Sequence, residues 1–165
     1  MTFAYRDGKQ VLKKLNLKIK SGEKIGIVGR TGAGKSSLIS ALFRLRNPRE
    51  GDIIVNGKNA VTESSLLNLR KGLSIIPQEP FIFADTIRKN IDPLEESADK
   101  DIWEVVENCG LDEKIRNLSE GLSYELAEKG ANLSVGEKQL ICLARATLKK
   151  SKILLIGKKF WVKKL

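Results

Sequence analysis

The chain has 165 residues, 41% of them hydrophobic, which is the length of one domain or of part of a larger one. No apolar run approaches the roughly 18 residues that a membrane-spanning helix needs. The first residues also lack the charged and apolar regions of a signal peptide, so we expect a cytoplasmic chain. Two isolated cysteines and no histidine argue against a zinc site and predict buried free thiols at Cys109 and Cys142.

Positive charge is concentrated at one end of the sequence. The net charge is +10, and residues 149–165 contain seven lysines and no acidic residue. The remaining residues are nearly balanced and have no basic stripe interleaved with aromatics, so we do not expect nucleic acid as the main partner. Lysines mixed with Phe160 and Trp161 would suit an anionic membrane surface. We instead expect residues 157–165 to be an atypical, accidental tail.

The first half of the sequence predicts strands and two helices. Alternating and continuous apolar patterns predict strands at 3–5, 11–19 and 25–28. A helix is expected over 35–45, where apolar residues fall on one face, and Pro48 and Gly51 end it. A strand with its turn follows at 51–57, a short helix at 64–71 and a buried strand at 73–76.

The second half is mostly helical. A polar-rich helical pattern covers 85–118 and is broken at Asp92-Pro93 and at Gly110. A loop is expected over 121–132, a strong helix over 134–148 and a strand over 153–156. Strands on both sides of a helical insertion indicate an α/β core with an α-helical subdomain at about 85–133.

A glycine-rich loop lies between the predicted strand 25–28 and the predicted helix 35–45. Its sequence, Gly29-Arg30-Thr31-Gly32-Ala33-Gly34-Lys35-Ser36, matches the Walker A pattern G-x-x-x-x-G-K-S. In such a loop the backbone N–H groups and the helix N-terminus hold phosphates, while the lysine contacts the β- and γ-phosphates and the serine binds Mg²⁺. We therefore expect the phosphates of a nucleotide and Mg²⁺ at Gly29, Thr31, Gly32, Ala33, Gly34, Lys35, Ser36 and Ser37, and the loop alone leaves kinases, GTPases and many ATPases open. The alternative is a glycine-rich turn before an ordinary helix.

A second motif opens the predicted helix 134–148. Leu133-Ser134-Val135-Gly136-Glu137-Lys138-Gln139 resembles the LSGGQ-type signature of ATP-binding cassette proteins, with Glu137 in place of the usual Gln. Ser134 and Glu137 also form a capping-box pattern, which many helices have without binding a ligand. Beside a Walker A motif, Ser134 and Gly136 at a helix N-terminus favour a γ-phosphate site instead.

The resemblance to the ATP-binding cassette family covers nearly the whole chain. Residues 75–80 look like the family's Q-loop, which implies that Gln78 contacts Mg²⁺ and the attacking water and couples the site to the membrane domains. Tyr5 matches the family's aromatic residue that stacks on adenine, although Phe3 and Tyr5 could equally share one core face. Asn90-Ile91-Asp92-Pro93 and the LSVG form of the signature are similar to the second nucleotide-binding domain of the C subfamily, the multidrug-resistance-associated type.

This resemblance implies a P-loop NTPase core with an antiparallel β subdomain and an α-helical subdomain, but the chain departs from the family after Ile156. The family continues with Asp-Glu, the Walker B aspartate for Mg²⁺ and the catalytic glutamate, where this chain has Gly157-Lys158. The D-loop and the switch histidine are also absent. We therefore expect residues 1–156 to be a partial, C-terminally incomplete cassette that binds ATP without hydrolysing it and has no catalytic residue. An unpaired last strand also predicts poor solubility in isolation.

Two functions from different classes follow. The first is a nucleotide-binding domain of an ATP-driven membrane exporter, at the cytoplasmic face, with a second cassette and transmembrane domains as partners. The second is a non-catalytic fragment that binds ATP or pairs with an intact cassette. An adenylate-kinase-type enzyme would have no use for residues 133–139, and chromosome-maintenance ATPases separate the two motifs by long coiled coils.

Overall fold

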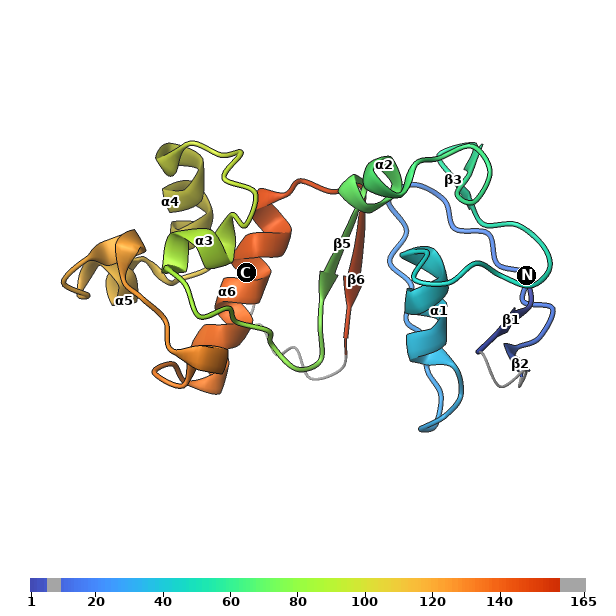
Figure 1. The fold of residues 1–165 in the computed structure, drawn as a ribbon, viewed down its shortest axis with the longest axis horizontal. Helices are drawn as coiled ribbons and strands as arrows, with labels where there is room; N and C mark the ends of the chain where they lie inside the picture. The colour runs from blue at the N-terminus through green and yellow to red at the C-terminus, as the bar shows by residue number, and fades with distance from the viewer. Residues whose placement is uncertain (6–9, 158–165) are drawn as a thin grey trace. The chain divides into compact units, whose positions relative to one another are not determined.

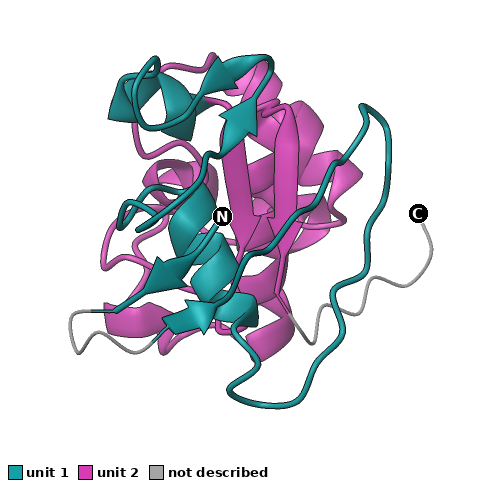
Figure 2. Ribbon diagram, turned by 90° about the vertical axis from the view of Figure 1, so that its right-hand side faces the viewer, with its two compact units in different colours: residues 1–71 teal, residues 72–165 magenta. Residues whose placement is uncertain are grey.

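Two compact units make up the fold, Met1–Lys71 and Gly72–Leu165 (Figure 2). The structure, a computed structural model, describes residues 1–5 and 10–157. The predicted tail 157–165 therefore lies outside the described residues, except for Gly157. Within the described ranges, no helix has the length and apolar character to cross a membrane.

Two antiparallel strand pairs belong to the first unit. β1 (Phe3–Ala4) pairs with β2 (Gln10–Leu12), and β3 (Ile54–Val55) pairs with β4 (Lys58–Asn59). The β3–β4 turn is Asn56-Gly57, with φ of 51° and 77°. Positive φ at both positions is the geometry of a two-residue hairpin turn, for which Asn-Gly is the favoured sequence. These pairs agree with the expected antiparallel β subdomain.

The helices of the first unit are α1 (Lys35–Leu42) and α2 (Leu66–Lys71), both close to their predicted ranges (Figure 1). α1 ends earlier than the predicted residue 45 because Arg44 adopts a left-handed backbone with φ of 49°. Ala41 on α1 is buried, together with Phe3 and Ala60. Burial of Ala41 gives α1 an inward face, and α1 begins at Lys35, at the end of the glycine-rich loop.

The strand predicted at 11–19 was wrong in its extent, and the strand predicted at 25–28 does not form. β2 ends at Leu12, and residues 25–28 form no strand. Ile25, Ile27 and Val28 are 45%, 49% and 97% exposed. A continuous apolar run is typical of a parallel strand that is covered on both faces. Such a strand forms only with neighbouring strands, and none of the described residues pairs with 25–28.

A parallel strand pair, β5 (Leu73–Ile76) and β6 (Ile153–Ile156), begins and ends the described part of the second unit. Figure 1 shows them side by side. Their register runs from Leu73 opposite Ile153 to Ile76 opposite Ile156. Leu73 and Ile76 are buried, whereas Leu154 and Ile156 on β6 are 48% and 60% exposed. Both predicted strands are confirmed, and β6 has the more exposed side chains.

A helical body connects the two parallel strands. Its helices are α3 (Ile87–Ile91), α4 (Asp99–Asn108), α5 (Asp112–Arg116) and α6 (Val135–Leu148). The predicted breaks are confirmed, since α3 ends before Asp92-Pro93 and Gly110, with φ of 69°, separates α4 from α5. The predicted loop 121–132 contains two 3₁₀ turns, Gly121–Ser123 and Glu128–Gly130.

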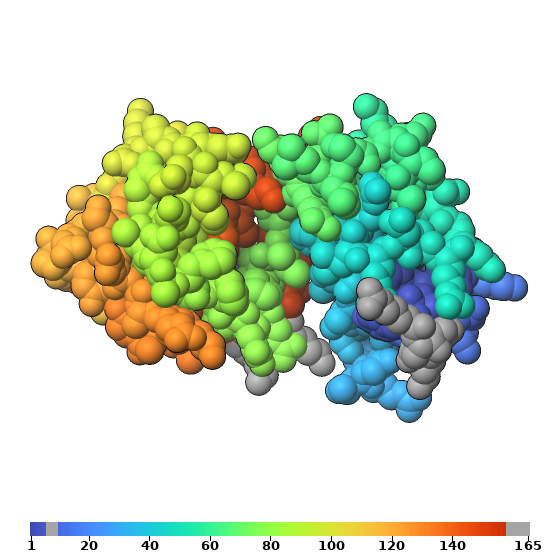
Figure 3. Space-filling model, in the orientation of Figure 1, coloured from blue at the N-terminus to red at the C-terminus, as the bar shows by residue number. Residues whose placement is uncertain are grey.

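The core of the helical body is apolar and continuous. Its members are buried side chains from each helix and from the loops between them, including Ile87, Ile91, Ile102, Val106, Ile115, Leu126 and Ile141. Residues of this body, yellow-green to orange in Figure 3, form a close-packed surface. Cys142 is a buried free thiol as predicted, but Cys109 is only half-buried because it caps the exposed end of α4. Burial still raises the pKa of Cys109 to about 11.

Candidate nucleotide-binding site

The Walker A loop turns its lysine back over its own backbone. Lys35 Nζ donates hydrogen bonds to the carbonyl oxygens of Gly29 at 2.5 Å and Arg30 at 2.9 Å. Ala33 N donates to Arg30 O at 3.1 Å and closes the turn. Thr31, Gly32 and Ala33 at the tip are exposed. The loop therefore presents an ammonium group whose acceptors are neutral carbonyl oxygens.

Two glycines of the loop have close neighbours. Gly34 has φ of 89°, and a Cβ there would lie 2.8 Å from Leu12 Cδ2 on β2. Gly29 has ordinary φ, but its Cβ would lie 3.0 Å from Ala33 Cβ. A side chain at Gly34 would strain the backbone and push against β2, whereas a side chain at Gly29 would require Ala33 to shift by a few tenths of an ångström. The glycine pattern therefore keeps the loop tight against β2.

The N-terminus of α1 is open to an anion. Its N-cap is Gly34, which has no side chain to accept from the first backbone N–H groups, and the first turn holds no acidic residue. Unpaired N–H groups and the helix dipole make such an end a binding site for phosphate. Ser36 is exposed in this first turn, where its hydroxyl can reach a bound cation.

Tyr5 lies against the same turn of α1. Its hydroxyl is hydrogen-bonded to Ser37 Oγ at 3.0 Å, and Ser37 is buried. The rings of Phe3 and Tyr5 are perpendicular, at 87° and 5.5 Å between centroids, and the Arg46 guanidinium lies over the Tyr5 ring at 5.5 Å. Phe3 is 0% exposed and Tyr5 is 37% exposed. Phe3 is therefore a core residue, while part of the Tyr5 ring is accessible beside the phosphate loop.

The capping box at the start of α6 is confirmed. Glu137 N donates to Ser134 Oγ at 3.2 Å, and Ser134 N donates to Glu137 Oε2 at 2.7 Å. The bond from the Ser134 backbone, with help from Lys114 at 3.2 Å, lowers the pKa of Glu137. Ser134 and Gly136 are exposed. A hydroxyl that accepts a bond still has its own proton to donate, so capping and phosphate binding are compatible.

Gln78 is exposed just beyond the carboxyl end of β5. There it meets Gly157, which follows β6: Gly157 N donates to Ile76 O at 2.8 Å. A Cβ on Gly157 would lie 2.6 Å from Gln78 N, which is closer than two such atoms can approach. Ligands of open parallel sheets bind at this edge. The space that a side chain at residue 157 would need is therefore occupied by the backbone of Gln78.

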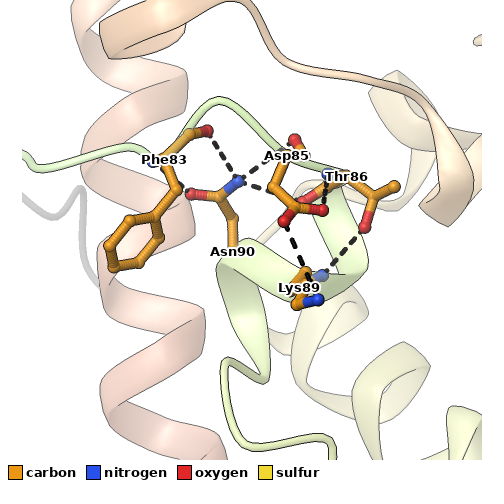
Figure 4. A network of polar contacts seen from close by, with 5 residues as sticks. All are labelled: Phe83, Asp85, Thr86, Lys89 and Asn90. Atoms are coloured by element: carbon orange, nitrogen blue, oxygen red, sulfur yellow. Dashed lines mark hydrogen bonds and ion pairs between the residues drawn. The ribbon is translucent and has the colours of Figure 1, made fainter.

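Sequence reasoning missed a buried polar cluster in the segment that follows Gln78. Asn90, 0% exposed, accepts from Phe83 N at 2.8 Å and donates to the carbonyls of Phe83, Asp85 and Thr86 at 3.0–3.3 Å (Figure 4). Arg145 of α6 donates to Asn90 O and to Phe81 O. The sequence signal was Asn90 itself, a polar residue inside a predicted helix, noted only as part of a subfamily motif.

A cavity of about 560 Å³ adjoins this cluster. Its lining comes from the segment after Gln78, from α3 and from the second 3₁₀ turn: Phe81, Ile82, Phe83, Ala84, Asp85, Lys89, Pro93, Glu128 and Lys129. Phe81 and Phe83 are 59% and 41% exposed.

Among the described residues no group of three or more His, Cys, Asp or Glu could hold a metal ion. A bound Mg²⁺ would therefore depend on phosphate oxygens, water and single side chains such as Ser36.

A glycine-rich loop that opens a helix in an α/β fold, with a capped signature helix in the same chain, defines the class of P-loop nucleotide-binding domains. The family model described as ABC transporter matches residues 12–157, so the chain belongs to the ABC transporter family. This confirms the expected cassette fold, and the C-subfamily resemblance is confirmed by the relatives below.

Similar proteins include ATP-binding cassette sub-family C member 4 of Mus musculus, 55% identical over 157 residues, and the Homo sapiens protein of the same name, 56% identical over 149 residues. The matches cover 94% and 90% of this chain but only 12% and 11% of those proteins. A bacterial Atm1-family ABC exporter solved with ATP bound is similar in structure, with a TM-score of 0.87 and 33% identity over 94% of this chain and 27% of that one. The chain is thus an ABC-type cassette related to exporters and spans about an eighth of its curated relatives.

Proposed function

We propose that the chain binds ATP with Mg²⁺ at residues 29–36. The observation that carries the proposal is the Lys35 ammonium group, 2.5 Å from Gly29 O and 2.9 Å from Arg30 O, beside an α1 N-terminus that no side chain caps. A phosphate oxygen carries more negative charge than a carbonyl oxygen, so it is the stronger partner for both groups. The β- and γ-phosphates would replace the two carbonyl contacts of Lys35.

The remaining nucleotide contacts are proposed from residues around α1 and, for Gln78, from the family resemblance. Tyr5, with its partly accessible ring beside α1, would stack on the adenine. Gly29, Thr31, Gly32, Ala33, Gly34 and Ser37 would surround the phosphates, and Ser36 would bind Mg²⁺. Gln78 would contact Mg²⁺ and the water near it, as its family resemblance implies. These roles assign binding residues and no catalytic residue.

The bound ATP should not be hydrolysed by this chain. Gly157 and Lys158 occupy the positions of the family's Walker B aspartate and catalytic glutamate. Gly157 lies so close to Gln78 N that the backbone itself would have to move to accept a carboxylate side chain. A missing general base lowers a rate by about 10²- to 10⁴-fold, and weaker Mg²⁺ binding would lower it further.

As part of an exporter, the chain would act at the cytoplasmic face with a second cassette and transmembrane domains. Ser134 and Gly136 would contact the γ-phosphate of ATP held by the second cassette. Support comes from their exposure at the N-terminus of α6, next to Val135, which is 65% exposed. An apolar side chain exposed beside an anion-binding helix end is suited to contact with another protein.

The second candidate is a non-catalytic fragment that pairs with an intact cassette. The exposed Leu154 and Ile156 of β6, together with Gly157 at the carboxylate position, favour it. This fragment would inhibit the ATPase of the cassette with which it pairs. Absence of association in a mixture of the two purified proteins would exclude it.

Titration of the purified chain with ATP-Mg, with phosphate release followed in the same sample, tests the main proposal. Lys35→Ala should abolish binding, whereas Lys58→Ala, an exposed lysine on β4, should leave it unchanged. Lysine-dependent binding without release supports the proposal. Equal binding by both variants, or no binding by the unmodified chain, contradicts the ATP site, and release that depends on Lys35 contradicts the lack of hydrolysis.

A further inference from the structure

One side chain, Arg145, joins α6 to the segment that follows Gln78. Arg145 Nε donates to Asn90 O at 2.6 Å, Nη1 to Phe81 O at 3.1 Å and Nη2 to Asn90 Oδ1 at 3.3 Å. Its guanidinium also lies 5.1 Å from the centre of the Phe83 ring. The contacts therefore reach both ends of residues 81–90.

The acceptors of Arg145 are themselves held in place. The Asn90 amide closes residues 83–90 into a loop through its bonds to three backbone carbonyls and to Phe83 N (Figure 4). Asn90 is 0% exposed, so water does not compete for these bonds. Movement of Arg145 would thus be transmitted to the whole loop.

We propose that Arg145 is a positioning residue that makes residues 81–90 move with α6 as one body. Ser134 caps the N-terminus of the same helix, eleven residues or about 16 Å along its axis. Phe81 follows Gln78 by three residues. Arg145 therefore couples the segment that follows Gln78 to the helix that begins after Ser134. The link itself rests on the hydrogen bonds of Arg145. Only the roles of Gln78 and Ser134 in ATP binding rest on the proposed function.

Arginine is suited to this position by shape as well as by charge. Its planar guanidinium offers five N–H donors in fixed directions and can stack on an aromatic ring at the same time. Here it meets three oxygens on two residues and the face of Phe83. A lysine would keep the charge but lose the fixed donor directions and the stacking. Arg145→Lys should therefore not restore the protection from hydrogen exchange that Arg145→Met removes.

Hydrogen exchange of the intact chain, resolved by segment, tests this. In Arg145→Met, amides in residues 79–92 should exchange at least about tenfold faster, because the three hydrogen bonds that tie this segment to α6 are lost. Amides in α4 and α5 should change less than about twofold. The matched control is Arg116→Met, which removes a guanidinium 4.6 Å from the Trp103 ring and its ion pair with Glu107 but leaves residues 79–92 untouched.

Faster exchange confined to residues 79–92, in both Arg145→Met and Arg145→Lys, supports the positioning role. Unchanged exchange, a uniform rise across the helical body, full rescue by lysine, or failure of both variants to fold would overturn it. Because the readout contains no nucleotide, failure here is distinguishable from failure of the ATP site, which the Lys35→Ala titration reports.

Discussion

Tyr5 and Ser37 are joined by a hydrogen bond of 3.0 Å between their hydroxyl oxygens, which connects the residue after β1 to the first turn of α1. Because Ser37 is buried, the bond fixes the ring of Tyr5 beside the phosphate loop. Mutation can distinguish the contribution of the Tyr5 ring from that of its hydroxyl. The ring is the group proposed to stack on adenine, and the hydroxyl is the group that holds it.

Tyr5→Phe should keep ATP affinity within about threefold and lower the free energy of unfolding by about 0.5–1.5 kcal/mol, the contribution of one hydrogen bond. Tyr5→Ala should weaken ATP binding by about 1–3 kcal/mol, since the stacking surface is lost. Inorganic tripolyphosphate, which has no base, should bind both variants equally. Isothermal titration measures both ligands, and equal losses for ATP and tripolyphosphate in Tyr5→Ala would contradict stacking.

The capping box of Ser134 and Glu137 should make the stability of α6 depend on pH. The pKa of Glu137 is lowered in the folded chain, mainly by the Ser134 backbone bond. Its stabilising contribution is therefore fully present above the ordinary value of 4.5 and is lost as the pH falls through the lower folded value. Glu137→Gln, which can still accept in the capping box, should be less stable than the unmodified chain at pH 7, with the difference shrinking below pH 4.5.

Urea unfolding at several pH values measures this difference. Glu104→Gln, at an exposed position of α4, is the control and should show no such trend. Ser134→Ala should lower the free energy of unfolding by about 1 kcal/mol at pH 7 because the N-cap acceptor is lost. A Glu137→Gln difference that stays constant down to pH 3 would show that the carboxylate charge has no part in the cap.

Gly34 combines a positive φ with a close neighbour, and the two effects can be separated. Gly34→Ala should lower the free energy of unfolding by about 2–4 kcal/mol, from left-handed strain and crowding against Leu12. Gly22, with φ of 79° and no atom within 4 Å of a built Cβ, is the control for strain alone. Gly22→Ala should lower the free energy of unfolding by about 1 kcal/mol. Thermal unfolding compares them, and equal losses would mean that Leu12 yields without cost.

Local motifs could be predicted from the sequence, but the strands that depend on distant partners could not. The capping box at Ser134 and the turn that belongs to the predicted strand 51–57 need only neighbouring residues, so their patterns predict them well. Residues 25–28 have an equally clear apolar pattern yet form no strand, because a strand is stabilised by pairing and not by its own composition. Arg145 was missed for the same reason: its acceptors are 55 and 64 residues away.

Gly157 provides the last prediction, because the position expected to hold a carboxylate meets the backbone of Gln78. A Cβ there would lie 2.6 Å from Gln78 N and 3.1 Å from Gln78 Cα, and backbone atoms cannot rotate away. Gly157→Ala should therefore lower the free energy of unfolding by about 1–3 kcal/mol. Gly136→Ala is the control, since its nearest atom is Ser134 Oγ at 4.0 Å and alanine favours a helix, so stability should be equal or slightly higher.

The same crowding limits any repair of hydrolysis at this position. The double variant Gly157→Asp with Lys158→Glu restores the family's two carboxylates in sequence, but the aspartate can enter only if β6 and the Gln78 backbone move apart. We expect the double variant to be less stable than the unmodified chain and to release no phosphate above the Lys35→Ala background. Lysine-dependent release by a stable double variant would instead mean that the backbone around Gln78 adapts, and that residues 157 and 158 alone prevent turnover.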